Sequence, residues 1–574
     1  MRRTAYLGAR MDKLWLKSYP EGVSPEITLD PQLSLVDMLE EACNQFPDRP
    51  AFTNFGHTLT YAEFDSQTAS FASALQHRLG LKPGDRLALM MPNLLQYPVA
   101  LFGALRAGLV VVNVNPLYTP RELRQQLADS GAKAIVVVKN SAATLAKAMK
   151  KAPIRHVIVT GIGDSLGFPK APIVNFVVRY VKRMVPHYSL PGAIEFREML
   201  KADGTELQRP PLTGADLACL QYTGGTTGVA KGAMLTHGNL LANVKQINTW
   251  FSGTWQRGEE VVVTPLPLYH VYALTCNCLA YLDLGAHNIL ITDPRDTQAF
   301  VAELKKWPFS AITGVNTLYQ SLVDYPGFRD VDFSSLKVAS AGGMAVMDFT
   351  ARAWSEITGT CILEGYGLSE TSPVVTSNRP DLKAFSGGIG LPLPGTEISL
   401  RNDSGQEVAR GEPGEICVRG PQVMRGYWNN NSASEKVMTP DRFLMTGDIA
   451  VMDEAGYFRI VDRKKDMILI SGFNVYPNEV ENVLTLHEDV IEAAVIGVPD
   501  KDNRRAVKAF VVLRPGARLT VKALRAYCRL NLAAYKVPRY VEFRNELPKS
   551  NVGKILRRAL REESANQVAE QVRA

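Results

Sequence analysis

Short apolar runs alternate with amphipathic segments in the first third of the chain, and this alternation constrains the fold more than any other feature. Strands that are connected through helices at such a spacing form a parallel sheet with helices on its faces. We therefore predict an α/β fold for this region. The predicted strands are Arg86–Met90, Val110–Val112 and Ala134–Val138, and the predicted helices between them cover residues 96–107 and 120–130.

The regions on either side extend this prediction. The segment from residue 35 to about 79 is expected to be mostly helical, with Ser34 as the N-cap of its first helix. Similar α/β signals cover residues 237–363, where Val261–Val263 and Ala339–Ala341 are predicted strand ends that enter loops. A length of 574 residues is enough for about two to four structural units.

The composition changes in the last third of the chain. Glycine and proline become dense between residues 387 and 460, and short β-runs such as Glu415–Val418 indicate a small β-rich subdomain. A compact α+β segment follows. We therefore predict an α/β protein with a large N-terminal domain (1–463) of parallel-sheet subdomains plus the β-rich subdomain, followed by a small, mobile α+β C-terminal domain (464–574).

The net charge of +7 comes from 64 Lys and Arg against 57 Asp and Glu. This mild positive balance suits anionic ligands such as nucleotides, coenzyme A or lipid headgroups, but it identifies none of them. The sequence has no dense run of Lys and Arg with interleaved aromatic residues, so nucleic-acid binding is not expected. No uninterrupted apolar stretch reaches the roughly 18 residues that a membrane span needs. The seven cysteines form no CxxC pair and have no metal-ligand spacing with histidines, so we interpret them as reduced structural thiols of a cytoplasmic protein.

Residues 169–186 (PKAPIVNFVVRYVKRMVP) are apolar and carry four basic side chains. Two interpretations stay open. The segment is a short basic amphipathic element that makes peripheral contact with the cytoplasmic face of the inner membrane. Alternatively, it is a helix that packs on the core and extends its basic side chains into solvent.

A stretch rich in glycine and threonine, YTGGTTGVAKG from Tyr222 to Gly232, carries the clearest chemistry. Its glycines let the backbone turn tightly and approach a ligand closely, and exposed N–H groups can form an anion-binding concavity. It is not a Walker A loop, because Lys231 is followed by glycine and not by serine or threonine. Such a loop fits a polyphosphate. The predicted binding residues are Thr223, Gly224, Gly225, Thr226, Thr227, Gly228 and Lys231.

The stretch resembles the phosphate loop of the adenylate-forming superfamily, which contains acyl-CoA synthetases, adenylation domains and firefly-type luciferases. Further motifs of this superfamily follow in order, and the resemblance covers essentially the whole chain from about residue 35. Within the superfamily, the chain is most similar to the bacterial long-chain fatty acyl-CoA synthetases of β-oxidation. The ordered motifs are Ser340–Gly343, Tyr366–Thr371, Thr446–Asp448, Asp462–Asp466 and Gly553–Lys554.

The resemblance implies a reaction in two steps. A fatty acid carboxylate attacks the α-phosphorus of ATP and pyrophosphate leaves; the thiol of coenzyme A then takes the acyl group from the acyl-adenylate. It also implies a role for each matching residue. Tyr366 stacks on adenine, Gly342 and Gly343 allow its close approach, and Gly367 belongs to the same nucleotide-binding set. Ser369 binds phosphate, Glu370 binds Mg²⁺, Asp448 binds the ribose hydroxyls, and Arg463 binds ribose or phosphate.

By the same resemblance, Lys554 is the mobile catalytic lysine of the first step, where its ammonium orients the carboxylate and stabilises charge on the α-phosphate. The C-terminal domain is expected to swing between the two steps about a hinge at Lys465, which also belongs to the predicted nucleotide-binding set. His270 has two interpretations, a substrate-positioning residue near the reacting carboxylate or a structural histidine, and the sequence favours the first.

The resemblance places the fatty acyl pocket at Val271–Leu274 and Thr313–Thr317. One departure from the family pattern affects the expected substrate preference. Phe443–Met445 stand where relatives usually have Trp-Leu-His, although Asp448 is kept. Four alternatives stay open. They are a ligase for medium-chain or aryl acids, an enzyme that loads a carrier protein, a luciferase-like oxidase, and a non-catalytic lipid- or nucleotide-binding scaffold. Relatives are often dimers, which makes a homodimer one candidate assembly.

Overall fold

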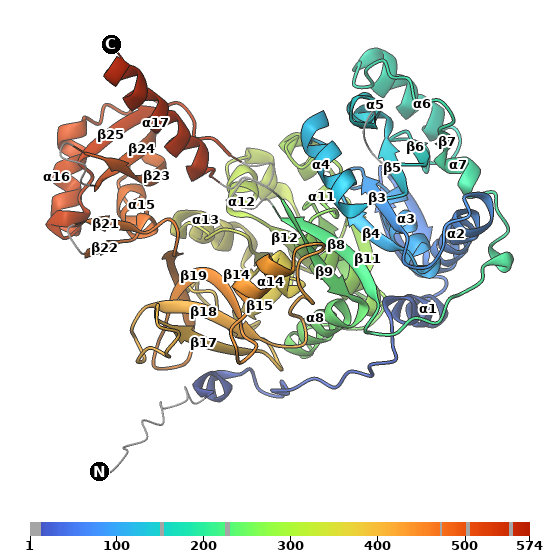
Figure 1. The fold of residues 1–574 in the computed structure, drawn as a ribbon, viewed down its shortest axis with the longest axis horizontal. Helices are drawn as coiled ribbons and strands as arrows, with labels where there is room; N and C mark the ends of the chain where they lie inside the picture. The colour runs from blue at the N-terminus through green and yellow to red at the C-terminus, as the bar shows by residue number, and fades with distance from the viewer. Residues whose placement is uncertain are drawn as a thin grey trace. The chain divides into compact units, whose positions relative to one another are not determined.

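The computed structural model describes residues 13–149, 154–223, 230–470, 473–500, 505–549 and 555–573. The chain divides into two compact units. One unit consists of Tyr19–Glu397 and Arg419–Arg442. The other contains Ile398–Val418 and the chain from Phe443 onward, together with the described residues before Tyr19. Figure 1 shows the course of the chain through both.

The first unit contains a seven-stranded sheet with the strand order β7-β6-β5-β3-β4-β8-β9. All neighbouring strands are parallel except β8 and β9, which form an antiparallel hairpin. The predicted parallel sheet is therefore confirmed. The strands are β3 (Arg86–Met90), β4 (Val110–Asn113), β5 (Ala134–Val138), β6 (His156–Thr160), β7 (Ile194–Glu195), β8 (Leu217–Thr223) and β9 (Lys231–Thr236).

A nine-stranded sheet forms the other half of this unit, in the order β16-β15-β14-β13-β12-β10-β11-β1-β2. Its central strands are parallel, and antiparallel strands close both edges. The strands are β1 (Pro50–Asn54), β2 (His57–Thr60), β10 (Val261–Thr264), β11 (His287–Leu290), β12 (Ala311–Gly314), β13 (Val338–Ala341), β14 (Ile362–Gly367), β15 (Val374–Ser377) and β16 (Leu391–Pro392).

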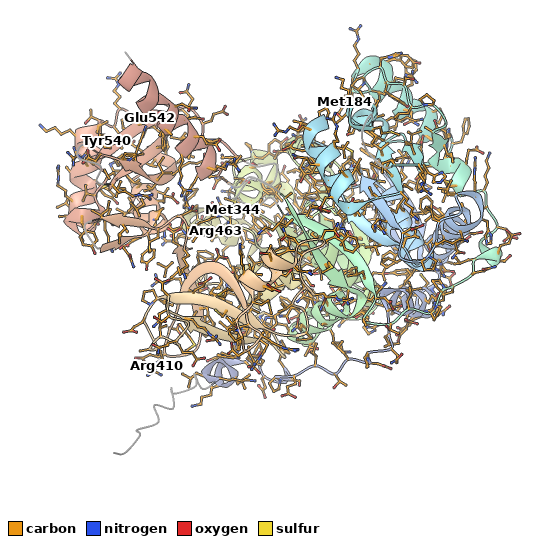
Figure 2. All side chains as sticks on the ribbon, in the orientation of Figure 1. Met184, Met344, Arg410, Arg463, Tyr540 and Glu542 are labelled. Atoms are coloured by element: carbon orange, nitrogen blue, oxygen red, sulfur yellow. The ribbon has the colours of Figure 1, made fainter. Side chains whose placement is uncertain are left out.

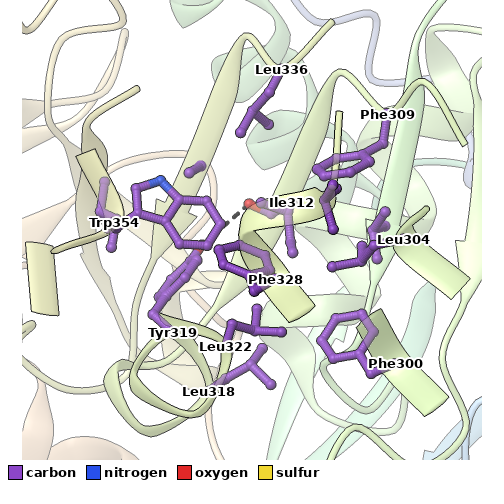
Figure 3. Close-up of a cluster of buried hydrophobic side chains, with 14 of the residues drawn as sticks. Phe300, Leu304, Phe309, Ile312, Leu318, Tyr319, Leu322, Phe328, Leu336 and Trp354 are labelled. Carbon is purple, nitrogen blue, oxygen red and sulfur yellow. Dashed lines mark hydrogen bonds between the residues drawn. The ribbon is translucent and has the colours of Figure 1, made fainter. Parts of the chain in front are cut away.

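A dense apolar core supports the ends of β12 and β13. Figure 3 shows this cluster, in which the rings of Tyr319 and Trp354 lie edge to face with their centroids 4.7 Å apart. The hydroxyl of Tyr319 donates to the carbonyl of Ser340 at 2.7 Å, the residue just before the Ala341–Gly343 turn. Burial of such aromatic side chains stabilises this region and fixes where the two strands end.

Helices lie between these strands in the sequence, and α3 packs against β3 and β4. The helices of this unit are α1 (Leu35–Gln45), α2 (Tyr61–Ser73), α3 (Gln96–Arg106), α4 (Pro120–Ser130), α5 (Ala142–Ala148), α6 (Lys170–Phe176), α7 (Phe196–Met199), α8 (His237–Trp250), α9 (Val271–Ala273), α10 (Ala280–Asp283), α11 (Thr297–Leu304), α12 (Asn316–Val323), α13 (Asp348–Thr358) and α14 (Asn431–Val437).

The prediction of a mostly helical segment from residue 35 to 79 is wrong in part. Helix α1 begins after Ser34, whose side chain forms the expected cap. However, the hairpin β1–β2 separates α1 from α2. Its turn contains Phe55 and Gly56, both with positive φ. A two-residue turn of this kind matches the twist of paired strands, so residues 50–60 form a β-hairpin where the sequence predicted mostly helix.

The second unit contains two sheet regions. The four-stranded sheet β17-β18-β19-β20 is the predicted β-rich subdomain, and the C-terminal part has the predicted α+β character with the sheet β23-β24-β25 and the pair β21–β22. The elements are β17 (Glu397–Arg401), β18 (Gly414–Arg419), β19 (Leu444–Met452), β20 (Phe458–Arg463), β21 (Ile468–Ile470), β22 (Phe473–Val475), α15 (Pro477–Thr485), β23 (Val490–Pro499), β24 (Arg505–Leu513), α16 (Val521–Asn531), β25 (Tyr540–Arg544) and α17 (Arg557–Arg573).

The basic apolar segment 169–186 lies at the surface of the first unit. Helix α6 and the helical turn Val177–Val181 that continues it bury only Ala171. Met184, which Figure 2 labels, lies beyond them and is also exposed. The interpretation as a helix packed on the core is therefore not supported. No helix in the described parts of the chain is both long and apolar enough to cross a membrane.

Candidate active site

The glycine-threonine loop connects the two strands of the β8–β9 hairpin. Thr223 and Lys231 are direct partners across this hairpin, so the loop begins and ends at one paired position. Gly224, Gly225, Thr226, Thr227 and Gly228 lie outside the described residues. The structure thus places the two ends of the predicted phosphate loop side by side at the end of an antiparallel pair.

The strand before this loop is fixed by a buried tyrosine. The hydroxyl of Tyr222 donates to Asp129 Oδ2 at 2.5 Å. A Cβ atom on Gly232, the residue paired with Tyr222, would lie 3.0 Å from the tyrosine ring. Such a contact is tighter than most Cβ contacts, so glycine lets β9 pass this ring without a shift of the ring. One glycine of the motif therefore has a packing reason that is independent of any ligand.

Tyr427 joins two of the predicted site residues. Its hydroxyl donates to Glu370 Oε1 at 2.8 Å, and Lys231 Nζ lies 5.0 Å from the centroid of its ring. Burial, together with the Glu370 carboxylate, raises the pKa of Tyr427, so the phenol remains protonated and acts as a donor. The structure therefore places Lys231 and Glu370 around one tyrosine that the sequence analysis did not select.

The predicted adenine-binding turn follows β13. Gly343 has a φ of +79°, a left-handed conformation that favours glycine, and a Cβ atom there would meet open space. Gly342 is different, because its Cβ position would lie 3.1 Å from the ring of Tyr272. The hydroxyl of Tyr272 also lies 3.2 Å from the hydroxyl of Ser340. Tyr272 belongs to the predicted acyl-pocket segment, so that segment contacts the turn directly.

Tyr366 and Gly367 end β14, and Ser369 and Glu370 lie in the short helical turn that follows. A Cβ atom on Gly367 would lie 1.9 Å from the carbonyl oxygen of Pro373. Glycine is therefore required at this position by the close approach of β14 to the chain before β15. The backbone N–H of Met424 donates to the carbonyl of Glu370 at 2.8 Å and ties this turn to the segment that contains Tyr427.

In the second unit, Asp448 and Arg463 are partners across β19 and β20. Arg463 Nε lies 3.2 Å from Asp448 Oδ1, and Asp448 is almost completely buried. The turn before Asp448 is held by Gly447, whose N–H donates to Glu415 Oε1 at 3.0 Å. The two residues with predicted ribose contacts thus form an ion pair with each other.

The predicted hinge residue Lys465 lies between β20 and β21. Burial lowers the pKa of Lys465, and the neighbouring Arg463 lowers it further. The carboxylate of the next residue, Asp466, binds Arg561 at 2.6 Å and Arg557 at 3.2 Å. A network of charged side chains therefore begins directly after the predicted hinge residue.

Arg557, the first residue of α17, is the centre of this network. Its guanidinium donates to Glu481, reaches Asp466, and lies 3.7 Å from the fully buried Asp462. Burial alone would lower the pKa of Arg557, but these three carboxylates raise it overall. Burial raises the pKa of Asp462 to about 6. The sequence analysis missed this cluster, because its members are separated by up to 95 residues along the chain.

His270 precedes α9, and its N–H donates to the carbonyl of Pro267 at 2.9 Å. Its side chain is partly exposed, so the structure does not make it a fully buried structural histidine. Thr313, in the second predicted acyl-pocket segment, is buried and donates to Asn277 Oδ1 at 2.9 Å. The roles predicted for His270 and for these segments stay predictions. Lys554 lies outside the described residues.

Glu364 on β14 is a buried carboxyl group that the sequence analysis did not identify. Its Oε1 accepts a hydrogen bond from the N–H of Val346 at 2.9 Å, just after the Gly342–Gly343 turn. Its Oε2 is buried and has no hydrogen-bond partner among the described residues. Burial raises the pKa of Glu364 to about 7, against a smaller opposite effect of the Val346 N–H. This carboxyl group therefore holds the end of the predicted adenine-binding loop.

Replacing this carboxyl group should change how stability depends on pH. Because the folded-state pKa lies above that of an unfolded glutamate, Glu364 stabilises the fold at low pH and loses this contribution as the pH rises through about 7. The loss amounts to about 3 kcal/mol at most. We expect Glu364→Gln to reduce the fall in denaturation midpoint between pH 5.5 and 8.5. The exposed Glu356→Gln is the control; an unchanged pH dependence in both variants would contradict the expectation.

Two family profiles match the chain. Residues 39–428 match the AMP-binding enzyme family, and residues 479–554 match the AMP-binding enzyme C-terminal domain. The first match alone covers more than half of the chain. The chain belongs to the AMP-binding enzyme family. The β8–β9 hairpin, β13, β14 and the segment that contains Tyr427 lie within the first match.

Curated relatives of this AMP-binding enzyme match it over nearly its full length. It is 56% identical to the long-chain-fatty-acid–CoA ligase of Escherichia coli O157:H7 over 97% of the chain and 99% of the relative. It is 52% identical to the enzyme of the same description from Haemophilus influenzae over 96% of the chain and 99% of the relative.

Solved structures confirm the fold of this AMP-binding enzyme. The anthranilate CoA ligase AuaEII in complex with anthranoyl-AMP superimposes with a TM-score of 0.82 at 25% identity, over 94% of the chain and 99% of that structure. ATP-bound MatB from Rhodopseudomonas palustris gives a TM-score of 0.79 at 28% identity, over 92% of the chain and 99% of that structure. Both support the predicted α/β fold with a large N-terminal and a small C-terminal domain.

Proposed function

We propose that this AMP-binding enzyme is a long-chain fatty acyl-CoA synthetase of fatty acid β-oxidation. A fatty acid carboxylate oxygen attacks the α-phosphorus of ATP, and the bond from phosphorus to pyrophosphate breaks. The sulfur of coenzyme A then attacks the acyl carbon, AMP leaves, and the thiol proton passes to solvent. The observation that carries the proposal is the 56% identity to a long-chain-fatty-acid–CoA ligase over 97% of the chain.

The proposal is tested by measuring AMP and acyl-CoA production with Mg-ATP and coenzyme A across acids of increasing length. Robust thioester formation with long chains supports it. A maximum with medium-chain or aryl acids favours the nearest alternative, and adenylate release without a thioester indicates a carrier-protein acceptor. If no acid causes ATP cleavage, the chain is a non-catalytic binding protein or acts on another class of substrate.

The Mg²⁺ that would accompany ATP fits the donor set around Glu370. One oxygen of Glu370 accepts from Tyr427, and no other described residue donates to the second oxygen, which would bind the metal. The described residues contain no group of three or more His, Cys, Asp and Glu side chains that could hold a metal. Mg²⁺ typically binds one or two carboxylates together with substrate phosphates, so a single glutamate suits it. When bound, the ion would neutralise phosphate charge, and Lys231 would contact the same phosphates.

A basic cavity in the second unit supports coenzyme A as the acceptor. It has a volume of about 350 Å³. Among the described residues, four arginines and no acidic residue line it, and Arg525 Nε is buried there without a hydrogen-bond partner. Coenzyme A carries a pyrophosphate and a 3′-phosphate, and guanidinium groups suit such anions. The lining residues are Ile470, Arg505, Ala506, Val507, Arg525, Arg529, Ala534, Tyr535, Val537 and Arg539.

We expect Arg525→Met to raise the KM for coenzyme A by about tenfold, because a charge-assisted contact to phosphate contributes about 1.5–3 kcal/mol. Pyrophosphate exchange in the absence of coenzyme A should not change. The exposed Arg558→Met is the matched control in the same unit. A variant that loses the exchange reaction and keeps its KM for coenzyme A would contradict this assignment.

The exposed segment 168–184 supports peripheral contact with the cytoplasmic face of the inner membrane, in an otherwise cytoplasmic enzyme. Phe168 is 92% exposed, and Phe176, Tyr180 and Val181 are also exposed. Residues 168–184 contain no acidic side chain and four basic ones. Apolar side chains beside cations suit the surface of a membrane that contains anionic lipids.

A homodimer also stays a prediction.

In flotation with vesicles that contain anionic phospholipid at low salt, we expect the native protein to rise with the lipid. Phe168→Ser combined with Phe176→Ser should reduce the floating fraction several-fold, because about 25 cal/mol per Å² of apolar burial is lost. Leu486→Ser, which removes an exposed apolar side chain elsewhere, should float like the native protein. A native protein that stays in the soluble fraction at low and high salt would exclude this contact.

A further inference from the structure

Tyr427 contacts the two oppositely charged groups of the candidate site in different ways. Its hydroxyl donates to the carboxylate of Glu370, while the face of its ring lies against the ammonium of Lys231. A cation over an aromatic face is attracted by the ring, and a phenol is a good donor to a carboxylate. The uncharged side chain of Tyr427 thus contacts both charges, through its hydroxyl at Glu370 and through its ring at Lys231.

The backbone around Tyr427 is fixed along β9. The N–H of Trp428 donates to the carbonyl of Gly232 at 2.8 Å, and the N–H of Met234 donates to the carbonyl of Gly426 at 2.9 Å. The N–H of Tyr427 itself donates to Ser434 Oγ at 2.8 Å. Main-chain hydrogen bonds of the residues before and after Tyr427 therefore fix the position of its ring.

The charges that Tyr427 contacts would otherwise attract each other. A direct ion pair between Lys231 and Glu370 would occupy the groups that are proposed to bind phosphate and metal, and it would have to break before the nucleotide binds. No carboxylate among the described residues forms an ion pair with Lys231. Within the described parts of the chain, the other side-chain oxygen of Glu370 accepts no hydrogen bond. Both groups are thus held ready for a ligand.

We propose that Tyr427 is a positioning residue that orients the Glu370 carboxylate for the metal and keeps it from pairing with Lys231. The inference deepens the proposed function and rests on the roles proposed there for Glu370 and Lys231. Hydrogen-bond partners of metal-binding carboxylates typically change metal affinity by about 10- to 100-fold when they are removed. The hydroxyl of Tyr427 would therefore set metal affinity, while its ring would set the position of Lys231.

The test measures metal binding directly. The probe is Mn²⁺ in the presence of a non-hydrolysable ATP analogue, and the concentration of unbound Mn²⁺ is read by electron paramagnetic resonance. We expect Tyr427→Phe to weaken Mn²⁺ binding about tenfold. In the pyrophosphate-exchange assay, it should raise the Mg²⁺ concentration for half-maximal rate by a similar factor, with little change in the KM for the fatty acid. Tyr427→Leu, which also removes the ring, should in addition weaken binding of the metal-free analogue.

Tyr222→Phe is the matched control. It also removes a buried phenol that donates to a carboxylate, on β8 beside the same strand β9, but its partner is Asp129. We expect it to leave Mn²⁺ binding unchanged, which separates the effect from a general loss of stability; melting curves of all variants check the fold. If Glu370→Gln weakens Mn²⁺ binding and Tyr427→Phe does not, the inference is wrong and the role of Glu370 stands. If Glu370→Gln also has no effect, both are wrong.

Discussion

Replacing Lys554 by alanine should abolish most adenylate formation while the enzyme still makes the thioester from supplied acyl-AMP. The resemblance to adenylate-forming enzymes places this lysine at the carboxylate and the α-phosphate, where charge develops in the first step only. Removing one such donor typically costs about 10²- to 10³-fold in rate. The two half-reactions are measured separately, as acid-dependent pyrophosphate exchange and as acyl-CoA formation from acyl-AMP.

Lys549 provides a control five residues earlier. Its ammonium pairs with Glu492, so it is a structural charge in the same part of the chain. Lys549→Ala should keep both half-reactions within about threefold of the native enzyme. Equal losses of both half-reactions in Lys554→Ala would refute the assignment, because they would indicate damage to the domain and not to the first step.

Replacing Arg557 by methionine should destabilise the second unit strongly. Its side chain is 17% exposed and is surrounded by Asp462, Asp466 and Glu481, whose side chains are 0%, 8% and 14% exposed. Among the described residues, methionine would leave these buried negative charges with one cationic partner, Arg561 beside Asp466. Breaking a buried ion pair from one side costs about 3–5 kcal/mol. Amide hydrogen exchange in β20 and α15 would measure this as a loss of protection.

The neighbouring Arg558 is the matched control, because it has the same chemistry without the burial. Its side chain is 56% exposed and pairs with Glu562 one helical turn away. Exposed pairs of this kind contribute about 0.3–0.5 kcal/mol, so Arg558→Met should leave protection nearly unchanged. Similar protection in both variants would mean that the Arg557 cluster does not hold α17 against β20.

Local elements of the fold could be predicted from the sequence where short-range signals agree. Helix α4 has the predicted bounds, because Thr119 and Glu122 form a capping box and proline begins the helix. Strands β3 and β5 also have the predicted bounds, because apolar runs of that length are buried on both faces of a parallel sheet. The β1–β2 hairpin was missed, because its strands are short and lie between two helical patterns.

The residues of the candidate site also fall into two groups: those that sequence signals predict and those that depend on tertiary contacts. Thr223 and Lys231 were selected for the chemistry of the glycine-threonine loop, and Gly343 and Glu370 because they stand in motifs that resemble those of a known superfamily. Tyr427 stands 57 residues from its partner Glu370 and in no motif that the sequence analysis recognised. Its position depends on the pairing of its segment with β9, which is a tertiary contact. Periodicity and composition carry no information about such contacts. Glu364 was missed for the same reason, because its contact with Val346 is also a tertiary one.

Tyr272 has a consequence for how substrate preference must be measured. Its ring lies against Gly342 in the predicted nucleotide region, and its own segment is the predicted acyl region. An acid that displaces this ring also acts on the turn that would bind the nucleotide, so the two substrates are thermodynamically linked, and each alters the affinity of the other by the same factor. A ranking of acids at one ATP concentration would therefore combine the fit of the chain with its effect on nucleotide affinity; only a grid of both concentrations separates them.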